Sequence, residues 1–420
     1  MGAELNKNLE RMKLLSTAEL KTGMYVVAPG IAWQERPYLY MEEGLLSSDA
    51  AVGKILEEGY LEVYIDPTRS PIYAEGGPLD APLAETKEIV AGRGTFRLAP
   101  KTLFAAEVKA AAEVHDAAVG YVREFMRDIR FGKLDMGPAT ELVNKIMHSL
   151  DQNADALLSL CRLRRTDGYT YMHCVNVSVL CGMFARAAGM GEKTAHAVSL
   201  AGLFHDLGKA LVPSEVLNAP RRLNEAERKV MNAHPSLGYE QIRDVPGVIA
   251  EVPLGMLHHH ERYGGGGYPA GIAGSDISLV GYIVALADIY DALTSKRVYK
   301  DGMPPHRALG VMYEMREKEL HPEMLVGFIR MLGVYPVGSV VEMSDGSLGV
   351  VNAGNVEAPL KPSVVLVRDA ENRPLPNIVC DLASPDNALS IECTMSEAET
   401  GIDPAAVLKL PGVPPHAGCK

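Results

Sequence analysis

Histidine and aspartate residues cluster in the middle of the sequence, next to apolar segments. Seven of the twelve histidines lie between His173 and His260. The pair His205-Asp206 follows one apolar run, and Asp288 follows another. A carboxylate within a buried apolar segment is costly unless it is paired or binds a metal. These positions therefore indicate a metal site.

The clustered side chains divide into two candidate sets of metal ligands. The first set is His173, His205, Asp206 and Asp288, and the second is His234, His259 and His260, with Asp206 as a bridge. Imidazole and carboxylate ligands without thiolates suit iron, manganese, nickel or zinc. Two metals about 3.5–4 Å apart activate a bridging water and stabilise an oxyanion, which suits in-line attack on phosphorus.

Other histidines are expected to have ordinary structural roles. For a single histidine such as His148 or His196, packing in the core is the simpler interpretation. His258 is expected in a loop or behind the ligands, although an exchange of register with His259 is an alternative. The glycines at 264–267 do not form a phosphate-binding loop, since no Lys-Ser/Thr follows them and they do not fit GxGxxG.

The segments that carry the candidate ligands have a helical pattern. From about residue 101 to 332, apolar residues recur at three- and four-residue steps, as on one face of a helix. Before this region, short strands are expected at 24–27 and 61–65, with a helix at 42–58 between them. After it, residues 338–351 have the pattern of a hairpin, and 363–367 that of another strand.

Composition excludes several classes of protein. The 420 residues are 47% hydrophobic and carry a net charge of -12, which disfavours a wholly disordered chain and a binder of nucleic-acid polymers. The start of the chain lacks the apolar core of a signal peptide, and the longest charge-free apolar stretch, 174–185, is too short to span a membrane. The six cysteines form no CxxC pair. These features predict a cytoplasmic protein with reduced thiols.

Four segments together resemble the HD-GYP family, a branch of the HD metal-dependent phosphohydrolases. They are His205-Asp206-Leu207-Gly208-Lys209, His259-His260-Glu261-Arg262-Tyr263, Gly265-Gly266-Gly267-Tyr268-Pro269 and Asp288-Ile289-Tyr290-Asp291-Ala292-Leu293-Thr294. Arg297-Val298-Tyr299-Lys300 follows the last of them. The resemblance covers roughly 140–335, and the flanking pieces are similar to the small N-terminal domain and short β tail of some members.

The resemblance implies a mainly α fold, with an all-helical HD-type core, a small α+β N-terminal domain and a short β-rich C-terminal extension. The predicted boundaries are 1–66 for the N-terminal domain, 67–100 for a linker, 101–139 for connecting helices, 140–335 for the catalytic domain, 336–403 for the β-rich extension and 404–420 for a flexible tail.

The resemblance also implies an activity, the hydrolysis of cyclic di-GMP to pGpG and, in some members, onward to GMP. The metal ligands would be His173, His205, Asp206, His234, His259, His260 and Asp288. They would hold two divalent ions, with iron or manganese preferred and nickel, cobalt or zinc as alternatives. Lys209, Arg297 and Lys300 would hold the phosphates, and Asp206 and Lys209 would act in catalysis. Tyr268 is expected to border the substrate as a packing or interaction residue.

Three departures from the family pattern affect these expectations. Gly264 stands where many members have Asp, which puts any role of that Asp in doubt. Tyr169 stands where members with three metals have an acidic ligand, so two metals are predicted. Val298 replaces the usual proline between Arg297 and Tyr299, which is expected to be tolerated.

Two alternatives to a cyclic di-GMP phosphodiesterase stay open. One is an HD hydrolase of another nucleotide, such as a cyclic GMP-AMP, because nothing in the sequence reads guanine directly. The other is a signalling protein that binds cyclic di-GMP or a diguanylate cyclase without turnover. In the family, the Gly-Tyr-Pro loop is linked to such partners. A homodimer is a further expectation.

Overall fold

The computed structural model describes residues 12–21, 24–27, 39–40, 43–46, 49–65, 96–129, 135–163, 169–219, 221–295 and 302–411. The chain forms two compact units. Unit 1 is Met1–Pro82 with Val212–Asn232, and unit 2 is Leu83–Leu211 with Ala233–Lys420. Unit 1 therefore combines two stretches that lie far apart in the sequence.

The N-terminal part of unit 1 is a small sheet with one α-helix and one short 3-10 helix. Its strands are β1 (Lys13–Ser16), β2 (Tyr25–Val27), β3 (Leu39–Tyr40), β4 (Gly44–Leu45) and β5 (Glu62–Ile65), and its helices are η1 (Thr17–Glu19) and α2 (Asp49–Glu57). The order is β1-β5-β2-β4, and β3 pairs with β5 in parallel. The predicted strands are confirmed. The helix predicted over 42–58 is too long, because residues 44–45 pair with β2 instead.

The second stretch of unit 1 contains two short helices, α8 (Ser214–Leu217) and α9 (Glu225–Met231). Arg222 between them reaches the N-terminal residues. Its Nη2 lies 2.6 Å from Glu58 Oε2, and its guanidinium lies over the rings of Tyr60 and Tyr40, at 5.1 and 5.7 Å from their centres. An ion pair and two cation–π contacts thus join the two stretches.

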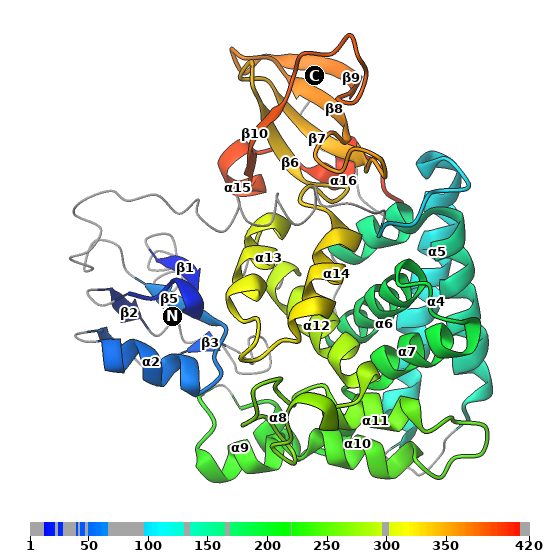
Figure 1. The fold of residues 1–420 in the computed structure, drawn as a ribbon, viewed down its shortest axis with the longest axis vertical. Helices are drawn as coiled ribbons and strands as arrows, with labels where there is room; N and C mark the ends of the chain where they lie inside the picture. The colour runs from blue at the N-terminus through cyan, green and yellow to red at the C-terminus, as the bar shows by residue number, and fades with distance from the viewer. Residues whose placement is uncertain are drawn as a thin grey trace. The chain divides into compact units, whose positions relative to one another are not determined.

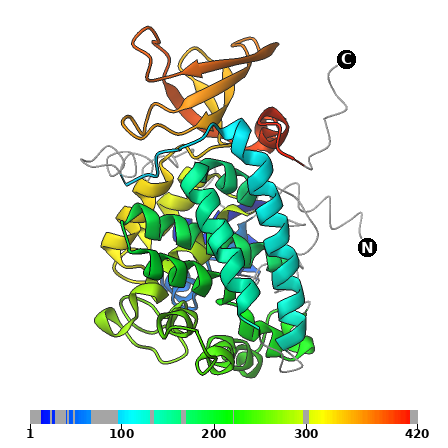
Figure 2. The ribbon, with the colours of Figure 1, turned by 90° about the vertical axis from the view of Figure 1, so that its right-hand side faces the viewer.

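Unit 2 is built around a bundle of helices (Figure 1). Its helices are α4 (Phe104–Asp128), α5 (Gly137–Leu163), α6 (Tyr169–Ala187), α7 (Glu192–Phe204), η6 (Leu207–Leu211), α10 (His234–Ile242), α11 (Glu251–His258), η7 (Gly274–Asp276), α12 (Leu279–Thr294), α13 (Pro305–Glu314) and α14 (Pro322–Leu332). Helices α6, α7 and α12 are apolar on nearly all sides and buried, as central helices must be. The long helices α4 and α5 run side by side (Figure 2).

A five-stranded antiparallel sheet follows the bundle in unit 2. Its strands are β6 (Val340–Met343), β7 (Leu348–Ala353), β8 (Ser363–Arg368), β9 (Pro374–Asp381) and β10 (Ile391–Met395), in the order β10-β6-β7-β8-β9. The predicted hairpin is β6–β7, and Gly346 in its turn has a φ of 83°, which glycine adopts without strain. Helices α15 (Glu397–Thr400) and α16 (Pro404–Val407) follow, so the predicted flexible tail starts with a helical turn.

These elements confirm a mainly α fold with β-structure at both ends. None of the described helices is both long and apolar enough to cross a lipid bilayer. The five cysteines in the described ranges carry free thiols.

Candidate metal centre

Asp206 lies at the middle of a buried cluster of histidines and aspartates. It sits in the turn between α7 and η6, and only 2% of its surface is exposed. Its two carboxylate oxygens face different neighbours. Oδ2 lies 3.4 Å from His205 Nε2 and 3.9 Å from His173 Nε2, whereas Oδ1 lies 3.4 Å from His234 Nε2 and 4.0 Å from His259 Nε2. One carboxylate is therefore shared by two groups of imidazoles.

The first group brings three elements together. His173 comes from α6, His205 follows α7, and Asp288 comes from α12. Asp288 Oδ1 lies 3.0 Å from His173 Nε2 and 3.9 Å from His205 Nε2. With Asp206 Oδ2, these atoms form the first predicted ligand set.

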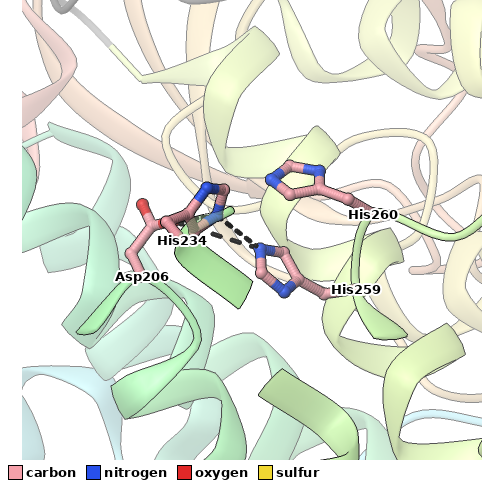
Figure 3. Close-up of side chains that lie close together, drawn as sticks. All are labelled: Asp206, His234, His259 and His260. Atoms are coloured by element: carbon pink, nitrogen blue, oxygen red, sulfur yellow. Dashed lines mark hydrogen bonds and ion pairs between the residues drawn. The ribbon is translucent and has the colours of Figure 1, made fainter. Parts of the chain in front are cut away.

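The second group combines the start of α10 with the end of α11 (Figure 3). His234 is the first residue of α10, and His259 and His260 directly follow α11. The Nε2 atoms of His234 and His259 lie 3.4 Å apart, and the rings of His259 and His260 are centred 4.0 Å apart. Ligand atoms of Asp206 and these three histidines all lie within 4.8 Å of one another. The second predicted set is thus also assembled.

Several ring nitrogens that face away from the cluster are engaged by hydrogen bonds. His205 Nδ1 donates to the Gly202 carbonyl at 2.8 Å, and His259 Nδ1 donates to the Met256 carbonyl at 2.6 Å. A hydrogen on Nδ1 leaves the lone pair on Nε2, which is the atom that faces the cluster. Outer hydrogen bonds of this kind fix the tautomer of metal-binding histidines.

The electrostatics of the cluster favour ionised aspartates. Burial alone would raise the pKa of Asp206, but the neighbouring His205 and Lys209 outweigh it and hold the pKa well below its usual value. Burial likewise opposes ionisation of Asp288, yet the hydrogen bond and charge of His173 lower its pKa strongly.

The pKa values of the histidines also depend on burial and on neighbouring charges. Burial lowers the pKa of His259 and His260 well below the usual value, so both rings are neutral near pH 7. Burial also opposes the charged form of His173, but its hydrogen bonds to Asp288 and Asp291 prevail and raise its pKa to about 9.

The donor set fits divalent metal ions. Asp206 Oδ1 and His205 Nε2 are buried and make no hydrogen bond within the described part of the chain. Burying such polar atoms is unfavourable unless another ligand satisfies them. Imidazole nitrogens and carboxylate oxygens without sulfur are donors that iron, manganese, nickel, cobalt and zinc accept.

Gly208 allows two ligand-bearing segments to approach each other closely. A Cβ atom at this position would lie 1.9 Å from the carbonyl oxygen of His234 and 2.7 Å from the amide nitrogen of Gly238. Only glycine fits against this backbone. Gly208 thus allows the segments that carry Asp206 and His234 to meet in one site.

The Gly-Tyr-Pro loop lies against the second ligand group. The Tyr268 ring stacks on His260 with ring centres 4.5 Å apart. Glu261 Oε1 accepts hydrogen bonds from the amides of Ala270 and Gly271, at 2.7 and 3.1 Å. These contacts fold the loop back so that Tyr268 backs a candidate ligand.

Gly264 is also explained by close packing. Its amide donates to the Lys318 carbonyl at 2.8 Å, and a Cβ at Gly264 would lie 2.8 Å from the same oxygen. An aspartate here would push against the turn between α13 and α14. The departure at this position therefore accompanies a tight local contact.

The remaining predicted site residues have varied placements. Lys209 Nζ lies 2.7 Å from Asp206 Oδ2 and is partly exposed. His258 stays out of the cluster, where its Nδ1 accepts a hydrogen bond from the Ser278 amide at 3.1 Å. Arg297 and Lys300 lie outside the described residues, as does the side chain of Tyr169.

Three residues around the cluster were not predicted from the sequence. Asp291 Oδ2 lies 2.8 Å from His173 Nδ1, Asn176 Nδ2 donates to Asp291 Oδ1 at 2.9 Å, and Glu261 holds the loop. Position offers a signal for two of them. Asn176 lies three residues after His173 and Asp291 three residues after Asp288, so each shares a helical face with a candidate ligand.

Family models match most of the chain. A model described as HD domain matches residues 144–324, and a model described as a domain of unknown function (DUF3391) matches residues 12–139. The first match contains all seven candidate ligands.

Relatives with assigned names match over different lengths. The chain is 34% identical over 373 residues to a cyclic di-GMP phosphodiesterase of Pseudomonas aeruginosa, covering 88% of this chain and 89% of that protein. It is 37% identical over 177 residues to the cyclic di-GMP phosphodiesterase response regulator RpfG of Xanthomonas campestris, covering 41% and 47%. It is 33% identical over 168 residues to the 3'3'-cGAMP-specific phosphodiesterase 3 of Vibrio cholerae, covering 40% and 36%. The first of these matches extends along nearly the whole of both chains, and together with the HD domain match it shows that the chain belongs to the HD-GYP family of HD-domain proteins.

Proposed function

We propose that this chain is a metal-dependent phosphodiesterase that hydrolyses cyclic di-GMP to pGpG, with onward cleavage to GMP as an optional second step. One observation carries the proposal, the shared carboxylate of Asp206 with one oxygen toward each group of imidazoles. The relatives named as cyclic di-GMP phosphodiesterases support the choice of substrate.

Two divalent ions would be held by the seven clustered side chains. His173, His205 and Asp288 would bind one ion, the three residues His234, His259 and His260 would bind the other, and Asp206 would bind both. When bound, such ions lower the pKa of a coordinated water and stabilise negative charge on phosphate oxygens. Iron or manganese is proposed first, with nickel, cobalt or zinc as alternatives.

The side chains of this protein would orient the substrate around that centre. The Lys209 ammonium is partly exposed beside Asp206, so it can approach a phosphate while staying next to the shared carboxylate. Arg297 and Lys300 are proposed as further phosphate ligands, since guanidinium groups bind phosphate through two parallel hydrogen bonds. A protein with a net charge of -12 needs such local cations to bind a dianion. Tyr268 would form a wall of the site.

A second candidate is hydrolysis of a cyclic GMP-AMP. The match to a 3'3'-cGAMP-specific phosphodiesterase of Vibrio cholerae favours it, although this match covers 40% of the chain. A catalytically weak protein that binds cyclic di-GMP or a diguanylate cyclase through the Gly-Tyr-Pro loop is the third. Homodimer formation and a cytoplasmic location stay predictions.

Turnover measured by chromatography tests the proposal. The protein is purified without oxygen, loaded with Fe(II) or Mn(II), and given cyclic di-GMP or 3'3'-cGAMP separately. Metal-dependent pGpG or GMP is expected, together with its loss in Asp206→Ala. His258→Asn is the matched control, because this histidine faces away from the cluster. Full turnover by Asp206→Ala would exclude the assigned centre, and cleavage of 3'3'-cGAMP alone would select the second candidate.

A further inference from the structure

A chain of buried side chains connects helix α4 to the candidate ligand His173. His115 Nε2 lies 3.3 Å from Asn176 Oδ1, and Asn176 Nδ2 donates to Asp291 Oδ1 at 2.9 Å. Asp291 Oδ2 lies 2.8 Å from His173 Nδ1. All four side chains are buried, with exposed fractions of 6% or less. Polar contacts therefore run without interruption from α4 to the metal centre.

The direction of each hydrogen bond follows from the amide of Asn176. Its Nδ2 donates both to the Cys161 carbonyl at 3.1 Å and to Asp291. The donating group of the amide is thus used, and its oxygen faces His115. His115 must then donate through Nε2, because an amide oxygen only accepts. His115 accordingly adds a hydrogen bond that supports the amide orientation set by the two acceptors.

The same logic continues to the ligand. A carboxylate only accepts, and Asp291 accepts from Asn176, from the Ser295 hydroxyl at 2.8 Å and from His173. His173 must therefore carry a hydrogen on Nδ1, so Nε2 is the nitrogen that a metal ion would take. That nitrogen is the one that faces Asp288 and Asp206. Asp291 thus orients His173, and the hydrogen bonds from Asn176 and His115 hold Asp291 in place.

Helix α4 lies outside the stretch matched by the HD domain model. His115 falls within the match of the domain of unknown function, at 12–139, whereas the other three residues fall within 144–324. The face of α4 that packs against the other helices of unit 2 is otherwise mainly apolar, with Val108, Ala111, Ala118 and Val122 buried. A buried imidazole among such residues is unfavourable unless its hydrogen bonds are used.

We propose that His115 is a positioning residue of the metal centre, acting through Asn176 and Asp291 on His173. Helix α4 would then be part of the site, although it brings no ligand of its own. The inference rests on the proposed metal centre. Loss of an outer hydrogen-bond partner of a ligand lowers metal affinity by about 10- to 100-fold. We expect about 10-fold for His115, which acts at a distance, and up to about 100-fold for Asp291, which contacts the ligand.

Titration with Co(II) tests this inference without relying on turnover. The visible absorption bands of bound Co(II) respond to the geometry of its ligands. The titration of the full-length protein, under anaerobic conditions, gives the number of ions bound and their affinity. His115→Ala is compared with Val122→Ala, which also shortens a buried side chain two turns later on the same face of α4. His115→Gln retains an amide donor. Asp291→Asn is the positive control, since its amide disturbs the bond to His173.

Loss of His115 is expected to weaken the binding of only one of the two ions. His115→Ala should bind one Co(II) about 10-fold more weakly and with shifted absorption bands, while Val122→Ala matches the wild type. His115→Gln should lie closer to the wild type than His115→Ala does. If His115→Ala is unfolded by circular dichroism, His115→Leu, which fills the space without a donor, takes its place under the same expectation.

Three outcomes separate the inference from the function on which it rests. Wild-type protein that binds no Co(II) would overturn the metal centre itself. Wild-type protein that binds two ions, with the alanine or leucine variant at position 115 binding both identically, would overturn only the role of His115. Equal weakening in His115→Ala and Val122→Ala would also overturn it, because loss of packing would then explain the effect.

Discussion

Exchanging one of two adjacent histidines for asparagine should separate a metal ligand from its neighbour. The side-chain oxygen or nitrogen of an asparagine can occupy the position of Nδ1 of a histidine ring. No atom of asparagine reaches the position of Nε2. His258 uses Nδ1 to accept from the Ser278 amide, and His259 uses Nδ1 to donate to the Met256 carbonyl. Both substitutions can keep these local contacts. Only His259→Asn removes a nitrogen that faces Asp206 and His234.

The size of the effect follows from the role of the lost atom. Loss of an outer partner of a ligand costs 10- to 100-fold in affinity, so loss of the ligand itself should cost at least about 100-fold. This corresponds to about 2.7 kcal/mol. At a metal concentration 100 times the wild-type Kd, the bound ion stabilises the wild type by about 2.7 kcal/mol. It should stabilise His259→Asn by only about 0.4 kcal/mol at that site.

The assay combines metal content after dialysis with thermal unfolding in the presence and absence of Mn(II). His258→Asn should retain two ions and the wild-type shift of Tm, whereas His259→Asn should retain one ion and lose part of the shift. The reverse result would mean that the ligand is His258 and that the register of this segment is wrong. Two ions bound tightly by both variants would refute the assignment of His259 altogether.

Further substitutions test other parts of the site and the fold. Gly208→Ala should cost about 1–3 kcal/mol in unfolding free energy and weaken metal binding, because its Cβ would meet the His234 carbonyl. Gly120→Ala, in open space on α4, should instead stabilise the protein by about 0.5–1 kcal/mol. If denaturant unfolding shows that both variants lose the same unfolding free energy, the close contact at Gly208 is not the cause. Tyr268→Phe should keep the metal affinity, whereas Tyr268→Ala should lower it by about 2- to 12-fold in a metal titration; no difference between them and the wild type would show that the stacked ring is dispensable. Arg222→Ala should destabilise unit 1 by about 1–2 kcal/mol, seen as faster amide hydrogen exchange in β5, and unchanged exchange would contradict the role of its ion pair and ring contacts.

Several candidate ligands could be predicted because charge or imidazole follows or interrupts an apolar helix there. His205 and Asp206 directly follow α7, and Asp288 lies inside α12, so burial of these helices forces the polar groups together. Spacing in the sequence does not show which oxygen of Asp206 faces which imidazole. That geometry depends on close contact of separate segments, such as Gly208 against His234.

Long-range contacts explain what the sequence did not predict. His115 and Asn176 are 61 residues apart in the chain, and each looks like an ordinary polar residue within its own helix. Strand β4 was missed because a two-residue strand has no pattern of its own and forms only where Tyr25 and Val26 pair with it. Both the His115–Asn176 contact and strand β4 depend on contacts between separate segments of the chain, which the local sequence pattern does not show.

The stretch Val212–Asn232 has a consequence for modularity. The chain leaves unit 2 shortly after Asp206, belongs to unit 1 for this stretch, and returns just before His234. The N-terminal domain therefore cannot be exchanged or removed at the predicted linker without loss of the contacts that Arg222 makes with Glu58, Tyr60 and Tyr40. In chimeras between relatives, the N-terminal domain and residues 212–232 should be inherited as a pair. A chimera that replaces only one of them should unfold at a lower temperature than one that replaces both.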